Sequence, residues 1–177
     1  MRNERELRVA GFVRVAGLDE VGRGCLAGPV VAAAVILPER HRIKGLRDSK
    51  MLPRARREAL YAQITDRAEA IGVGCVEVEV IDRVNIYQAT KHAMRQALDR
   101  LPLTPDHLLI DALSLRDIDL PQRSIIHGDA ISASIAAAGR SVAPREHGPA
   151  TCLEPSGRRI LGLRPEQMAR VCHHHSP

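Results

Sequence analysis

Three carboxylates stand where apolar segments of the chain end or are interrupted. Asp19 and Glu20 follow the segment FVRVAGL, and Asp111 lies within the apolar segment LLIDAL. An ionised carboxylate in an apolar strand is costly unless it is paired or bound to a metal ion. Two such places in one small domain predict strand ends that converge on a cation. Carboxylate and water oxygens favour Mg²⁺ or Mn²⁺, whereas zinc prefers His and Cys.

The pair of adjacent acids carries a geometric condition. Neighbouring strand residues point to opposite faces, so Asp19 and Glu20 share a site only if the strand bends or ends there. The glycines at positions 22 and 24 allow such a bend. A structural alternative remains open, in which Asp19 caps a turn and Asp111 pairs with an arginine.

The loop Gly22-Arg23-Gly24 has two interpretations. Its backbone could approach a ligand closely, with Arg23 ready to bind a phosphate. It could also be an ordinary tight turn. The loop is not a P-loop, because no GK[ST] follows it, and it is not a complete dinucleotide-binding fingerprint.

The elements that must position these residues follow from the hydrophobic periodicity. Helices are predicted from Pro53 onward, over 82–101 and over 131–138. Strands are predicted over 12–21, 29–37, 70–81, 107–113 and 123–129. This order predicts an α/β domain with a mixed sheet flanked by helices.

Composition and charge narrow the class of protein. The 177 residues, 45% hydrophobic and 27% charged, are typical of one globular domain. The first sixty residues hold 13 Lys/Arg against 7 Asp/Glu, which suits a polyanionic partner. Only three aromatic residues are present, which argues against a single-strand binder built on stacked bases.

The same sequence gives expectations about location. No apolar run approaches the ~18 residues of a membrane span, and the N-terminal MRNERELRVA has no apolar signal core. The four cysteines lie far apart, which indicates reduced thiols. We therefore expect a cytoplasmic protein that does not enter membranes, and we expect a monomer.

Five blocks in order resemble bacterial ribonuclease HII, the type 2 ribonuclease H. They are AGLDEVGRGCLAGPVVAAAVILP, GLRDSKML, NIYQATKHAMRQAL, LLIDAL and HGDAISASIAAA, spread over about residues 13 to 138. The resemblance implies an RNase H-like fold that cleaves RNA in RNA–DNA hybrids, including single ribonucleotides in duplex DNA, with Mn²⁺ or Mg²⁺. By motif, it implies metal ligands at Asp19, Glu20 and Asp111. It also implies a loop that senses the ribose 2′-hydroxyl at Gly22, Arg23 and Gly24, and a phosphate contact at Ser49 and Lys50.

The resemblance stops after Ala138. The family continues with an AKxxRD helix that carries a fourth catalytic aspartate, and residues 139–177 contain neither this helix nor any aromatic residue. We expect residues 1–138 to form the catalytic domain and residues 139–177 to be a poorly ordered tail. We interpret this tail as the product of a frameshift in the gene. Without the fourth acid, activity would be impaired. The alternatives are a non-catalytic binder of hybrid or duplex nucleic acid and, less favoured because it leaves GRG and DSK unexplained, an unrelated metal-dependent phosphotransfer enzyme.

Overall fold

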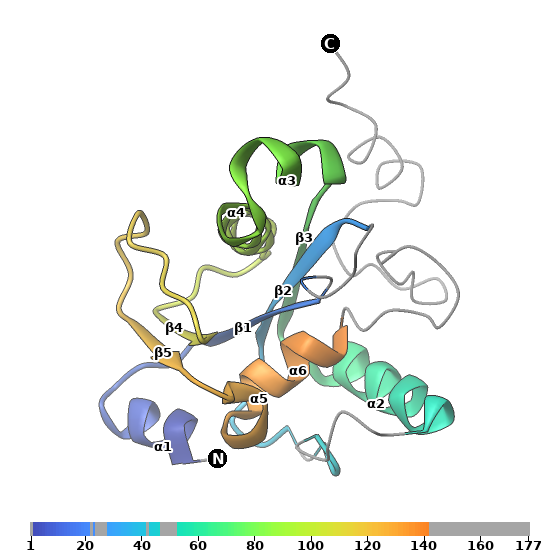
Figure 1. Ribbon diagram of the computed structural model, residues 1–177. Coiled ribbons are helices and arrows are strands. Elements are labelled where there is room, and N and C mark those ends of the chain that lie inside the picture. The colour runs from blue at the N-terminus through green and yellow to red at the C-terminus, as the bar shows by residue number, and fades with distance from the viewer. Residues whose placement is uncertain (1, 22, 24–27, 42, 47–52, 142–177) are drawn as a thin grey trace.

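Five strands form one mixed sheet in the order β3-β2-β1-β4-β5 (Figure 1). β1 (Val15–Val21) is antiparallel to β2 (Val30–Ile36), and β2 is antiparallel to β3 (Ala70–Val76). On its other side β1 is parallel to β4 (His107–Asp111), and β4 is parallel to β5 (Gln122–Ile125). The predicted α/β class with a mixed sheet is confirmed.

Helices cover both faces of this sheet (Figure 1). The computed structural model describes residues 2–21, 23, 28–41, 43–46 and 53–141. α4 (Ile86–Asp99) packs on one face, and α2 (Arg54–Arg67) and α6 (Ala133–Ser141) pack on the other. α5 (Gly128–Ile131) precedes α6, and α1 (Arg2–Val9) packs through Leu7 beside β4 and β5.

β2 explains the continuous apolar run of the sequence. All seven of its residues are buried, because α4 covers one face of the strand while α2 and α6 cover the other. A strand covered on both faces has no exposed positions and therefore shows no alternation of polar and apolar residues.

Two predicted strands include residues that form helices or lead into them. The segment predicted as one strand over 70–81 is β3 only to Val76, and α3 (Val78–Val84) follows it. The valines alternate, but Val80, Ile81 and Val84 also stand at helical spacing and pack against the core beneath α4. The strand predicted over 123–129 spans 122–125, since the chain turns at His127 into α5.

Two further features of the helices were not predicted. The helix expected over 82–101 is interrupted at Asn85, whose φ of 73° ends α3 and whose side chain caps α4 by accepting the Tyr87 and Gln88 N–H groups. The N-terminal helix α1 was not expected at all. No helix within the described residues has the length and apolar character needed to cross a membrane.

Candidate active site

Asp19 and Asp111 lie side by side where the parallel pairing of β1 with β4 ends. The last paired positions of β1 and β4 are Leu18 and Ile110, so the two aspartates occupy the next position on each strand. Neighbouring strands lie about 4.8 Å apart. Leu18 and Ile110 point into the core beneath α4, so alternation turns both aspartates toward the face that α6 covers.

Asp19 is enclosed by its own strand end and by α6. Its Oδ1 accepts a hydrogen bond from the Glu20 N–H at 2.8 Å. Gly139 of α6 lies against Oδ2 so closely that a Cβ at position 139 would overlap it. Burial, followed by the negative charges of Asp111 and Glu20, raises the pKa of Asp19 to about 8. Carboxylates of like charge therefore lie close together in a largely buried environment, and a bound cation would reduce their repulsion.

Asp111 is fixed by the start of α5. Its Oδ1 accepts a hydrogen bond from the Gly128 N–H at 2.9 Å. The residues next to these two groups, Ala112 and His127, both have left-handed backbones, with φ of 51° and 56°. Such conformations are uncommon for residues other than glycine and persist where the surrounding structure holds them.

Glu20 stands on the other side of the strand from Asp19. It is paired with Ala32 of β2 and follows the alternation of Ala16 and Leu18, which face α4. Its Oε1 accepts from Arg23 Nη1 at 3.0 Å. Burial raises the pKa of Glu20, and Arg23 opposes that rise. Its other oxygen, Oε2, is buried and has no hydrogen-bond partner among the described residues.

A fourth carboxylate belongs to the same group and was missed from the sequence. Asp129 lies in the first turn of α5, directly after Gly128, and its charge helps to raise the pKa of Asp19. The available signal was an acid in the block HGDAIS, at the end of the strand predicted over 123–129. We call Asp19, Glu20, Asp111 and Asp129 the carboxylate cluster.

Other predicted site residues lie outside the described residues. These are Gly22, Gly24, Ser49 and Lys50, together with positions 142–177 of the predicted tail. The remaining loop residue, Arg23, is described and contacts Glu20 as given above.

The donor set of the carboxylate cluster fits a hard divalent cation. The ligands on offer are carboxylate oxygens, which suit Mg²⁺ and Mn²⁺. The buried Oε2 of Glu20 and the raised pKa of Asp19 are features that a bound cation would compensate. Within the described part of the chain, no three acidic, His or Cys side chains already converge as a complete metal-binding set.

Comparisons with known proteins agree on one family. The family model for ribonuclease HII matches residues 16–145. Ribonuclease HII of Geobacillus thermodenitrificans (strain NG80-2) is 59% identical over 138 residues, which are 78% of this chain and 53% of the relative. The chain spans about half the length of the curated relatives it matches.

Solved structures show the same fold. The ribonuclease H2 of Pyrococcus horikoshii OT3 is similar with a TM-score of 0.64 and 25% identity, over 72% of this chain and 69% of that chain. Bst-RNase HIII, solved in complex with Mn²⁺, is similar in fold with a TM-score of 0.57 and 23% identity, over 72% of this chain and 50% of that chain. With the family model matched over most of its length, the chain belongs to the ribonuclease HII family.

Proposed function

We propose that this chain is a metal-dependent endoribonuclease that hydrolyses the RNA strand of RNA–DNA hybrids and cuts at single ribonucleotides in duplex DNA. The observation that carries the proposal is the parallel pairing of β1 and β4, which sets Asp19 beside Asp111 in a member of this family. Metal-assisted phosphodiester hydrolysis needs carboxylates held at a fixed point of a rigid scaffold, where they can bind the divalent ions.

The cofactor is a divalent cation, Mg²⁺ or Mn²⁺, held by the carboxylate cluster. When bound, such ions make the attacking water more acidic and neutralise the charge on the leaving oxygen. Asp19 and Asp111 would supply ligands from the α6 face of the sheet and Asp129 from α5, whereas Glu20 would approach from the opposite side of β1. Asp129 takes the place of the fourth acid that the sequence resemblance puts in an absent AKxxRD helix, so we expect the chain to be active.

Recognition of the substrate falls to the loop after β1 and to the DSK segment. Arg23 lies in contact with Glu20, at the edge of the carboxylate cluster, and its side chain is 41% exposed. A guanidinium in this place can bind a phosphate while the flanking Gly22 and Gly24 let the backbone reach the 2′-hydroxyl, the group that distinguishes RNA from DNA. Ser49 and Lys50 would add a phosphate contact. We further propose that the protein acts as a cytoplasmic monomer.

Cleavage of a labelled RNA–DNA hybrid tests this function. With Mn²⁺ or Mg²⁺ we expect endonucleolytic cuts in the RNA strand, no cuts in duplex DNA, and no activity in EDTA. Asp129→Asn should lower the rate by about 100-fold or more. The matched control Asp119→Asn, an exposed aspartate before β5, should leave it unchanged.

The same experiment decides between the proposal and its alternative. A folded protein that binds the hybrid tightly without cutting it under any metal condition would be a non-catalytic nucleic-acid binder of this fold. Equal rates for Asp129→Asn and the wild type would remove Asp129 from the carboxylate cluster.

A further inference from the structure

Glu4 is a buried carboxylate on a helix that otherwise faces solvent. Only Glu4, 8% exposed, and Leu7, 4% exposed, are buried in α1. Acidic residues are rarely buried unless hydrogen bonds compensate the loss of water. Glu4 is not a member of the carboxylate cluster, so its burial calls for another explanation.

The Glu4 carboxylate binds the junction between α5 and α6. Its Oε1 accepts hydrogen bonds from the Ser132 hydroxyl at 2.7 Å and from the Ser134 N–H at 3.1 Å, both buried. Ser132 joins the two helices: its N–H donates to the Gly128 carbonyl at 2.7 Å, and its hydroxyl accepts from the Ile135 N–H at 3.2 Å. One carboxylate thus binds both the end of α5 and the start of α6. Negative charge is favoured at the start of a helix such as α6.

Both helices lead from this junction to the carboxylate cluster. α5 begins with Gly128, whose N–H binds Asp111, and continues with Asp129. α6 reaches Gly139, which lies against the carboxylate of Asp19. A shift of the junction would therefore move groups next to both aspartates at the strand ends.

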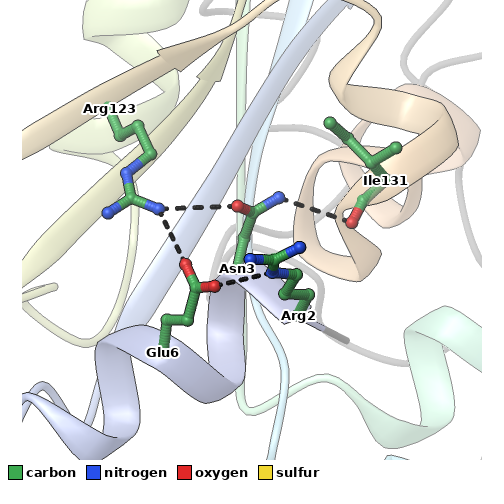
Figure 2. A network of polar contacts seen from close by, with 5 residues as sticks. All are labelled: Arg2, Asn3, Glu6, Arg123 and Ile131. Atoms are coloured by element: carbon green, nitrogen blue, oxygen red, sulfur yellow. Dashed lines mark hydrogen bonds and ion pairs between the residues drawn. The ribbon is translucent and has the colours of Figure 1, made fainter.

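Leu7 of α1 also packs with the buried Ile135 of α6, and the other polar contacts of α1 drawn in Figure 2 are exposed. Asn3 Nδ2 donates to the Ile131 carbonyl at 3.5 Å, and Arg123 Nη1 reaches Asn3 Oδ1 at 3.5 Å and Glu6 Oε2 at 3.4 Å. Arg2 adds an exposed pair with Glu6 at 2.8 Å. Exposed pairs of this kind contribute little to stability. The buried hydrogen bonds of Glu4 are the stronger link.

From these contacts we infer that Glu4 is a positioning residue, which holds the α5–α6 junction so that the Gly128 N–H binds Asp111 and Asp129 stays near Asp19. The effect on metal binding rests on the proposed function, whereas the effect on the geometry of Gly128 does not. Residues that orient metal ligands without contacting the metal themselves typically lower the metal affinity by about 10–100-fold when they are removed.

Hydrogen exchange at the Gly128 amide tests the inference directly, because this N–H binds Asp111. In the full chain without metal, NMR should show that Glu4→Ala speeds Gly128 exchange by at least about tenfold, while the amide of Gly74, which lies opposite Ala32 in the β2–β3 pairing, keeps its rate. Glu4→Gln retains an acceptor oxygen and should restore slow exchange. Glu6→Ala, on the exposed side of the same helix, is the matched control and should behave as the wild type.

Binding of Mn²⁺, followed by electron paramagnetic resonance, gives the second readout. Glu4→Ala should require about tenfold more Mn²⁺ for half-saturation, and Glu6→Ala should not. If Glu4→Ala fails to fold, Ser132→Ala can replace it, because this variant removes one of the two hydrogen bonds to the Glu4 carboxylate. Its effect is measured by exchange of the same Gly128 amide.

Three results would overturn the inference. The first is unchanged Gly128 exchange in Glu4→Ala or Ser132→Ala. The second is equal acceleration of Gly128 and Gly74, which marks a general loss of stability. The third is Glu4→Gln exchanging as fast as Glu4→Ala. Absence of Mn²⁺ binding by the wild type would contradict the proposed function instead, and Gly128 exchange would still decide the role of Glu4.

Discussion

Asp19 shows how the position of one residue determines the chemistry of the site. It lies one position beyond the last pair of two parallel strands, next to Asp111, and α6 closes over it. Burial and neighbouring negative charge raise its pKa to about 8. Without a cation the carboxyl is therefore protonated across much of the neutral range, and a divalent ion would bind by displacing this proton.

The raised pKa of Asp19 predicts how stability depends on pH. In the folded protein Asp19 keeps its proton up to about pH 8, whereas in the unfolded chain an aspartate loses it near 3.9. The folded state binds the extra proton in this window, so stability is lost as the pH rises through it. Asp19→Asn has no ionisable group at this position and should not show this loss. Between pH 5 and pH 8 the free energy of unfolding should therefore fall less in the variant than in the wild type, by at least about 1.4 kcal/mol, the equivalent of one pKa unit.

Urea unfolding in EDTA at the two pH values measures this difference. Asp119→Asn, an exposed substitution of the same kind, should leave the pH dependence unchanged. Parallel curves for Asp19→Asn and the wild type would show that Asp19 ionises normally. In the cleavage assay Asp19→Asn should abolish activity while hybrid binding stays intact or tightens, because repulsion of the phosphates falls.

At the scale of elements, the distance between α6 and β1 governs the site. Gly17 of β1 touches the backbone of Ser134 at the start of α6, and Gly139 touches Asp19 farther along the same helix. α6 can lie close to the strand only because these two positions carry no side chain.

Alanine at these two glycines should have different consequences. Gly17→Ala places a Cβ against the backbone of Ser134, which cannot move aside, so we expect a loss of about 1–3 kcal/mol or more in the free energy of unfolding. Gly139→Ala meets a side-chain oxygen of Asp19 and should displace that carboxylate, lowering the cleavage rate with a smaller loss of stability. Thermal unfolding and hybrid cleavage separate the two effects, and a fully active Gly139→Ala would contradict the described packing.

The strands and helices with clear periodicity were predictable from the sequence, and the junctions between them were not. The apolar run of β2 and the stripe of α4 follow directly from the burial of one or two faces. The change from β3 to α3 depends on how Val80 and Ile81 pack against distant residues, and the pattern of valines alone fits either structure.

The site was predictable in part for the same reason. Asp19 and Asp111 stand out because acids interrupt apolar strands, and a parallel pairing then brings them together. Glu4 has no such signal, since it lies in a charged N-terminal segment, and the signal for Asp129 is weaker, an acid at the end of the strand predicted over 123–129. Their places depend on how α5 and α1 pack, which is decided by contacts far apart in the sequence.

At the scale of the whole molecule, the predicted change of sequence character falls within α6. This helix runs from Ala133 to Ser141, and the family model matches as far as residue 145. We propose that the reading frame changes in or shortly after this helix. Translation of the coding DNA beyond codon 138 in the other two forward frames should reveal an AKxxRD segment and a KGY-like block. Finding neither would make residues 139–177 a true variant of the family.

We propose that the carboxylate cluster of this chain cuts next to a ribonucleotide with the help of a divalent cation. Incubation of the purified 177-residue protein with a DNA duplex that carries a single ribonucleotide, in Mn²⁺, in Mg²⁺ and in EDTA, tests this proposal. We expect one cut at the ribonucleotide with either metal and none in EDTA. If the folded protein binds the duplex but leaves it intact in all three conditions, or if cutting continues in EDTA, the proposed metal-dependent cleavage is wrong.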